Sequence, residues 1–204
     1  MLNVKVGYHC ITWWQGKEKN FIKSLDEISA VGYKGFETGL FLIDEYYGRE
    51  KELGRRAKDY GLKSAYHLHF GTMVETRKQL TWLMENTDPD LVGLTADTAH
   101  ITRGGSDPVE VFQTYIDRIP YTHFKDIDMN EVKEDTAKGD YRSIIHYFKE
   151  LGEGKVDFPS IIRIMDKSNY NGWIMVELDS TTRTQIESAR ISKRYLEDEL
   201  GIKV

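Results

Sequence analysis

Short apolar runs alternate with amphipathic segments along the 204 residues of this chain. Strand-like runs cover residues 3–9, 35–40, 62–69, 91–97, 121–125 and 173–178. Helical spacing, with capping and stop signals, covers residues 21–31, 45–60, 75–85, 109–119, 141–151, 159–168 and 184–200. Nearly continuous apolar strands that alternate with helices are typical of a parallel sheet covered by helices. The pattern predicts a barrel-like or doubly wound α/β fold.

The end of the first strand helps to choose between these two folds. It carries Tyr8-His9-Cys10 and no glycine-rich phosphate-binding turn, which disfavours a dinucleotide-binding fold. A complete barrel of eight units needs about 250 residues. We therefore predict a TIM-barrel-like parallel β/α barrel that is incomplete, with about six strands, and that forms a single domain over residues 1–204.

Composition excludes several classes of function. With 40% hydrophobic and 30% charged residues, the chain fits one soluble domain with a real core. A net charge of −5 argues against nucleic-acid binding, and no apolar run reaches the length of a membrane span. The N-terminus enters a strand pattern at once, without a signal peptide, and a single cysteine cannot form an internal disulfide. We expect a cytoplasmic protein without nucleic-acid or membrane partners.

Acidic and imidazole groups gather at the carboxyl ends of the predicted strands. Five of the six histidines lie there, and the sixth, His146, lies in a predicted helix and is expected to be structural or exposed. In β/α barrels the carboxyl ends of the strands meet at one face, which carries the reactive groups. Asp97, His123 and Glu177 would converge there and are suitable ligands for a divalent metal.

Each of these residues has a structural alternative. Asp97 could cap a helix, although Asp107 before Pro108 is the more convincing cap. His123 could be a satisfied core histidine, and Glu177 could pair with a basic residue. His100 could be a second ligand, a proton carrier or a loop residue. His67 and His69 would share one strand face by period two, which leaves open which of them enters the site.

Several motifs carry a resemblance to a known family. They occur in the order GYHCITWW, YHLHFGTMVET, DTAH, HFKD, GEGKVDF and VELD, and the last four are specific in combination. In these motifs the chain resembles the xylose-isomerase-like barrel superfamily, most closely its inosose dehydratase branch. The similarity extends over nearly the whole chain. In this resemblance the segment around residues 61–67 joins the start of a third strand to the end of a fifth, which implies that about two βα units are absent.

The resemblance implies a divalent metal, manganese or cobalt, with magnesium and zinc as alternatives. Its ligands would be Asp97, His123 and Glu177. The fourth ligand would be His69 or His67, with Glu75 as a more distant candidate. A barrel without two units would expose strand edges unless the six strands reclose or pair across a homo-oligomer.

The activity implied is dehydration of a small cyclic ketopolyol such as 2-keto-myo-inositol, through an enediolate and β-elimination of water. Glu177 would act as ligand and base, and His100 or His69 would protonate the departing hydroxyl. The alternatives are a sugar isomerase or epimerase of the same superfamily, and a shortened barrel that only binds metal or ligand.

Further residues are expected to contact the substrate. Trp13 and Trp14 would form an apolar wall, or simply pack. Glu37 would bind substrate hydroxyls or pair with a surface lysine. Lys125 would neutralise an oxyanion, and His67 would line the site if it is not a ligand.

Overall fold

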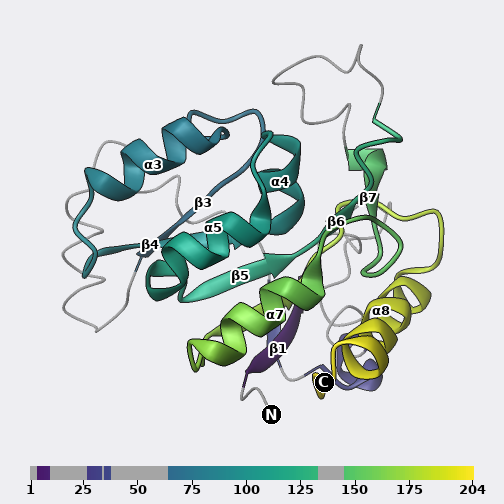
Figure 1. Cartoon of the computed structure of the whole chain (residues 1–204). Helices are drawn as coiled ribbons and strands as arrows, with labels where there is room; N and C mark the ends of the chain where they lie inside the picture. The colour runs from purple at the N-terminus through teal and green to yellow at the C-terminus, as the bar shows by residue number, and fades with distance from the viewer. Residues whose placement is uncertain (1–3, 10–26, 34, 38–63, 133–144) are drawn as a thin grey trace, which may run out of the picture.

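A parallel sheet forms the centre of the computed structural model, which describes residues 4–9, 27–33, 35–37, 64–132 and 145–204 (Figure 1). Its six strands are β1 (Lys5–His9), β2 (Gly35–Glu37), β3 (Ser64–His67), β4 (Val92–Asp97), β5 (Tyr121–Phe124) and β8 (Trp173–Val176). They lie in the order β2-β1-β8-β5-β4-β3, and every neighbouring pair is parallel. Each predicted strand is thus present.

The strand order is that of a barrel from which consecutive units are missing. The first strand, β1, pairs with the last strand, β8, as closure of a barrel requires. β2 and β3 form the two edges of the sheet and do not pair with each other within the described residues. The predicted shortening therefore falls at the seam between β2 and β3. Of the two arrangements that would cover the strand edges, reclosure through this pair is not seen among the described residues, and pairing across a homo-oligomer stays a prediction.

Alternation along the strands separates a helix-facing side from a polar side. On β4 and β8 the apolar residues Leu94, Ala96, Ile174 and Val176 join the main core, together with Phe124 of β5. The side chains between them point to the other face of the sheet because successive strand residues alternate. That other face carries the candidate site residues.

Five helices begin at side chains that accept a backbone N–H. They are α3 (Arg77–Glu85), α4 (Thr98–Arg103), α5 (Pro108–Tyr115), α7 (Phe158–Lys167) and α8 (Gln185–Arg194), and their caps are Thr76, Asp97, Asp107, Asp157 and Thr184. Such caps satisfy N–H groups that have no partner in the first helical turn. Short turns follow α5 and α8, at Ile116–Arg118 (η3, a 3₁₀ turn) and Tyr195–Glu199 (η5, a π-helical turn).

The helices cover the apolar side of the sheet. Figure 1 shows α3, α5 and α7 side by side over the strands. Arg77 of α3 donates to Thr114 of α5 at 2.9 Å, and Phe158 of α7 packs on Phe124 of β5 with ring centroids 4.9 Å apart. The predicted helix at residues 21–31 is described only over its last turn, and it ends at Gly32, whose φ of 107° favours glycine.

The prediction of a helix over residues 141–151 is wrong where the structure describes them. Residues Ile145–Tyr147 form a 3₁₀ turn (η4), and Phe148–Lys149 form a short strand, β7, which pairs antiparallel with β6 (Asp126–Ile127). Phe148 is buried in a second apolar cluster with Phe70, Ala99, Ile127 and Leu178. The helical spacing is therefore overridden by the burial of Phe148 on β7. His146, expected to be structural or exposed and to lie in a helix, is exposed and lies in the 3₁₀ turn.

Among the described residues, no helix combines the length and the apolar character needed to cross a membrane.

Candidate metal centre

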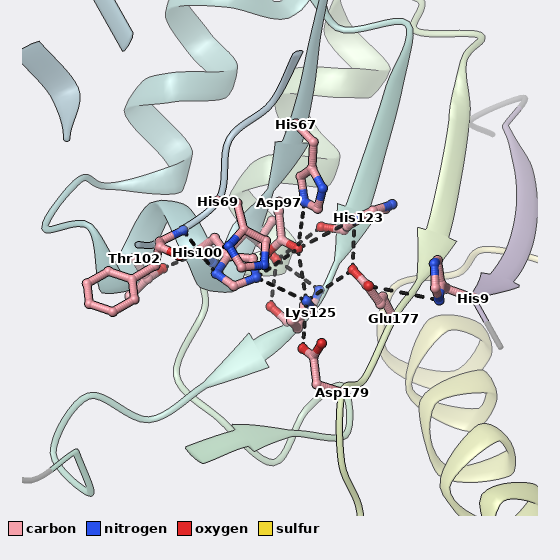
Figure 2. A network of polar contacts seen from close by, with 12 residues as sticks. His9, His67, His69, Asp97, His100, Thr102, His123, Lys125, Glu177 and Asp179 are labelled. Carbon is pink, nitrogen blue, oxygen red and sulfur yellow. Dashed lines mark hydrogen bonds and ion pairs between the residues drawn. The ribbon is translucent and has the colours of Figure 1, made fainter. Parts of the chain in front are cut away.

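Four side chains from four adjacent strands meet on the polar side of the sheet (Figure 2). His67 Nε2 lies 3.4 Å from Asp97 Oδ2, and His123 Nδ1 lies 3.5 Å from the same oxygen and 2.8 Å from Glu177 Oε2. One nitrogen or oxygen of each residue lies within 4.8 Å of all the others. Ligand atoms about 2.0–2.2 Å from one ion are at most about 4.4 Å apart, so shifts of a few tenths of an ångström would fit them around a divalent metal.

The register of the strands explains why these residues meet. Asp97 on β4 is the direct partner of His123 on β5, and His67 on β3 is opposite Thr95. Glu177 immediately follows β8, and its N–H continues the ladder to the carbonyl oxygen of Phe124 at 3.1 Å. Side chains on one face of neighbouring parallel strands lie close together, so the adjacency of β3, β4, β5 and β8 in the sheet builds the cluster.

Asp97 combines both roles that the sequence left open. Its Oδ1 accepts the N–H of His100 at 3.0 Å and caps α4, a helix that the sequence pattern did not predict. Its Oδ2 faces His67, His123 and Lys125. The cap fixes the carboxylate, so that one oxygen is aimed at the other donors.

Lys125 lies at the centre of the carboxylates. Its Nζ is 3.2 Å from Asp97 Oδ2, 3.0 Å from Glu177 Oε2 and 2.8 Å from Asp179 Oδ2, and it also lies 4.9 Å from the ring centroid of Phe148. Among the described residues it is the only buried lysine or arginine. Lys125 therefore holds three carboxylates together from below the four donors, where Figure 2 shows it.

The balance of charge fits a divalent cation. Asp97, Glu177 and Asp179 are buried, and with neutral histidines Lys125 compensates only one of these three carboxylates. Burial raises the pKa of Asp97 and of Glu177, but Lys125 and the surrounding imidazoles outweigh this effect and hold the pKa of both well below the ordinary value. Both groups are thus carboxylates at neutral pH. An excess of two buried negative charges favours a divalent ion.

His69 and His100 stack on each other beside this cluster. Their ring centroids are 3.7 Å apart, and both contact the backbone of Phe70. His69 Nδ1 donates to the Phe70 carbonyl oxygen at 2.7 Å, so the neutral ring has its lone pair on Nε2. His100 Nδ1 accepts the Phe70 N–H at 3.3 Å. Burial lowers the pKa of both imidazoles, and they are neutral near pH 7.

Only one of the three candidates for the fourth ligand position lies in the donor cluster. His67, rather than His69, lies among the four donors, because β3 ends at His67 and period two does not continue to His69. Glu75 accepts the N–H of Gly71 at 2.8 Å and is not in the cluster.

The residues expected to contact the substrate near the N-terminus cannot be placed in the site. Trp13 and Trp14 lie outside the described residues. Glu37 is the register partner of His9, but its side chain is outside the described part.

Three residues of the site have no role assigned from the sequence, although His9 is one of the five histidines at strand ends. Asp179 contacts Lys125, His9 Nδ1 lies 3.9 Å from Glu177 Oε1, and the Tyr121 hydroxyl lies 2.9 Å from His123 Nε2. Position could have identified two of them. His9 ends the first strand, and Tyr121 precedes His123 by two residues on the same strand face.

Asp126, which follows Lys125 in the HFKD motif, has a structural role. Its carboxylate accepts the backbone N–H groups of Ile127, Gly152, Gly154 and Val156 at 2.9–3.0 Å. Three of these donors belong to the GEGKVDF motif. The carboxylate of one motif therefore holds the loop formed by the other beside the site.

The chain is similar to proteins of known name along most of its length. Residues 42–199 match the family model described as xylose isomerase-like TIM barrel. An inosose dehydratase of Lactiplantibacillus plantarum is 38% identical over 72% of this chain, which spans 51% of that protein. An inosose dehydratase of Clostridium perfringens is 31% identical over 93% of this chain and 73% of that protein.

The aligned stretch with the C. perfringens protein is longer than this chain, so the alignment opens gaps within it. The chain thus spans about half the length of the first relatives that it matches and is shortened internally, as predicted. The crystal structure of the IOLI protein with a binding zinc atom has the same fold, with a TM-score of 0.57 and 18% identity over 95% of this chain and 75% of that one. With its parallel sheet, its strand order and its family match, the chain belongs to the xylose isomerase-like TIM barrel family.

Proposed function

We propose that His67, Asp97, His123 and Glu177 bind one divalent metal ion, and that the chain uses it to dehydrate a small cyclic ketopolyol of the inosose type. The observation that carries the proposal is the convergence of four nitrogen and oxygen donors within 4.8 Å of one another. His67 takes the fourth ligand position in place of His69. Mixed imidazole and carboxylate ligands accept manganese, cobalt, zinc or magnesium.

The dehydratase activity is supported by the names of the relatives. Both the L. plantarum and the C. perfringens proteins are inosose dehydratases. In such a reaction a base removes a proton from the carbon next to the carbonyl, a hydroxyl leaves the following carbon as water, and a carbon–carbon double bond forms. A bound divalent ion supplies Lewis acidity, which polarises the carbonyl and makes the neighbouring C–H bond more acidic.

The residues of this chain can supply the remaining steps. Glu177 is a carboxylate whose Oε1 points away from the donor cluster toward His9, and it can accept the proton. The neutral rings of His69 and His100 can take up a proton and return it to the departing hydroxyl. The ammonium of Lys125 can stabilise negative charge that develops on a substrate oxygen.

A shortened barrel that binds metal without catalysis is the second candidate, because the chain spans only 51% of its L. plantarum relative. The two βα units that are missing at the seam between β2 and β3 would contribute part of the substrate pocket in a complete barrel. An isomerase or epimerase would need the same proton removal but no loss of hydroxyl.

The test of the metal site is titration calorimetry of the chelator-treated protein with Mn²⁺, Co²⁺, Zn²⁺ and Mg²⁺. We expect one ion per chain for the wild type and no stoichiometric binding for Asp97→Asn. The amide of this variant can still cap α4, but it replaces the charged ligand. Asp107→Asn is the matched control, because Asp107 caps α5 through Val109 at 2.8 Å and lies outside the cluster. Equal binding by wild type and Asp97→Asn would refute the metal site.

The test of the activity is incubation of the metal-loaded protein with inososes and with ketohexoses, followed by mass analysis of the products. A product lighter by one water supports the dehydratase. A product of unchanged mass but altered configuration would identify an isomerase or epimerase instead. Stoichiometric metal without turnover of either substrate class would identify the non-catalytic barrel.

A further inference from the structure

The hydroxyl of Tyr121 lies 2.9 Å from Nε2 of His123, on the side of the ring that faces away from the carboxylates. We propose that Tyr121 is a positioning residue that fixes the orientation and the tautomer of His123 for metal binding. The inference rests on the proposed metal site and extends it to a residue that binds no metal itself.

The two nitrogens of His123 have separate environments. Nδ1 lies 2.8 Å from Glu177 Oε2 and 3.5 Å from Asp97 Oδ2, so Nδ1 is the nitrogen that faces the other metal donors. His123 is 3% exposed, so solvent has little access to either ring nitrogen. A ligating nitrogen must carry a lone pair, so the hydrogen of the neutral ring has to reside on Nε2.

A tyrosine hydroxyl suits this requirement because it can either donate or accept a hydrogen bond. Before metal binding, a hydrogen on Nδ1 faces the Glu177 carboxylate, with Nδ1 2.8 Å from Oε2, and Nε2 then accepts the Tyr121 O–H. With metal on Nδ1, Nε2–H donates to the Tyr121 oxygen. The same pair of atoms therefore remains hydrogen-bonded in both states, and only the direction of donation changes. A carboxylate in this place could only accept.

The backbone places Tyr121 for this role. It begins β5, and His123 follows two residues later on the same strand face. The two rings also meet edge to face, with centroids 5.1 Å apart and planes at 74°. Phenylalanine at position 121 would keep this ring contact and lose only the hydroxyl, so Tyr121→Phe isolates the hydrogen bond.

The experiment measures Co²⁺ affinity by titration calorimetry and unfolding in urea with chelator. Removal of the partner of a metal-ligating histidine weakens metal binding by roughly 10–100-fold, and we expect about tenfold for this neutral hydroxyl. The control is Tyr170→Phe, since the Tyr170 hydroxyl donates to the Trp173 carbonyl oxygen at 3.2 Å, at the opposite end of β8 from Glu177. This control removes a hydroxyl hydrogen bond without contact to a ligand.

A loss of about tenfold in Co²⁺ affinity for Tyr121→Phe, with unchanged affinity for Tyr170→Phe, supports the positioning role. Co²⁺ binding by Tyr121→Phe within twofold of the wild type would overturn it. An equal loss in both variants would also overturn it, because it would indicate a general effect of lost stability that the urea data would show. Failure of the wild type to bind Co²⁺ would refute the metal site itself. The wild-type titration alone therefore separates that outcome from a failure of the Tyr121 inference.

Discussion

The carboxylate of Asp126 offers a demanding test of how the loop beside the site is held. Asp126 Oδ1 accepts the N–H groups of Ile127 and Val156, and Oδ2 accepts those of Gly152 and Gly154. The residue is 1% exposed. In Asp126→Asn one oxygen becomes an NH₂ group, so two of the four backbone N–H groups would face a donor instead of an acceptor.

The magnitude follows from the number of N–H groups that lose their acceptor. Each buried N–H without a partner costs about 1–3 kcal/mol, and the two groups on Oδ2 are partly buried. We therefore expect Asp126→Asn to lower the free energy of unfolding by about 2–4 kcal/mol. The loss of stability should arise because the loop at residues 152–156 and strand β6 are no longer held together.

Urea denaturation in the presence of chelator measures this loss. Asp107→Asn is the matched control, since it makes the same chemical change at an exposed cap, and asparagine caps a helix about as well as aspartate. It should change the free energy of unfolding by less than about 0.5 kcal/mol. A loss below about 1 kcal/mol for Asp126→Asn, or one equal to that of the control, would show that the four hydrogen bonds do not hold the loop as argued.

Three further outcomes are expected. Lys125→Met should lower the free energy of unfolding in chelator by roughly 3–5 kcal/mol, since three buried carboxylates lose their ammonium, and saturating Mn²⁺ should restore much of it. Urea curves with and without Mn²⁺ check this, and identical losses in both would contradict it. His67→Ala should weaken Mn²⁺ binding in calorimetry more than His69→Ala does, because only His67 is in the donor cluster; the reverse order would restore His69 as the ligand. Gly154→Ala should lower the urea midpoint by an amount equivalent to about 1–3 kcal/mol, because a methyl group there would collide with the Asp126 carboxylate; an unchanged midpoint would show that the loop can move aside.

Much of the sheet and three of the four donors could be predicted from the sequence. Parallel strands buried on both faces are continuous apolar runs, and an acid or a histidine at the end of such a run stands out. Asp97, His123 and Glu177 all do so. The helix at α5 was predictable for a local reason, since Asp107-Pro108 is a cap followed by a proline in the first turn.

The features that the sequence leaves open or mispredicts depend on tertiary structure. Whether His67 or His69 enters the cluster depends on where β3 ends, and the boundary of a strand is not visible in an apolar run. Residues 145–151 have helical spacing, but pairing of Phe148 with Ile127 and burial beneath His100 outweigh it. The sequence pattern does not predict the short helix α4, because Asp97 stands where either a ligand or a cap is expected, and the structure uses one oxygen of its carboxylate for each role.

The four donors come from β3, β4, β5 and β8, which are contiguous in the sheet, while the seam left by the absent units lies between β2 and β3. Gain or loss of units at that seam can therefore remodel one wall of the barrel during evolution without breaking a single hydrogen-bonded contact between the strands that bear the donors. The donors on β4, β5 and β8 lie inside the sheet, whereas β3, which carries His67, is itself an edge of the seam, so His67 is the donor most exposed to a change there.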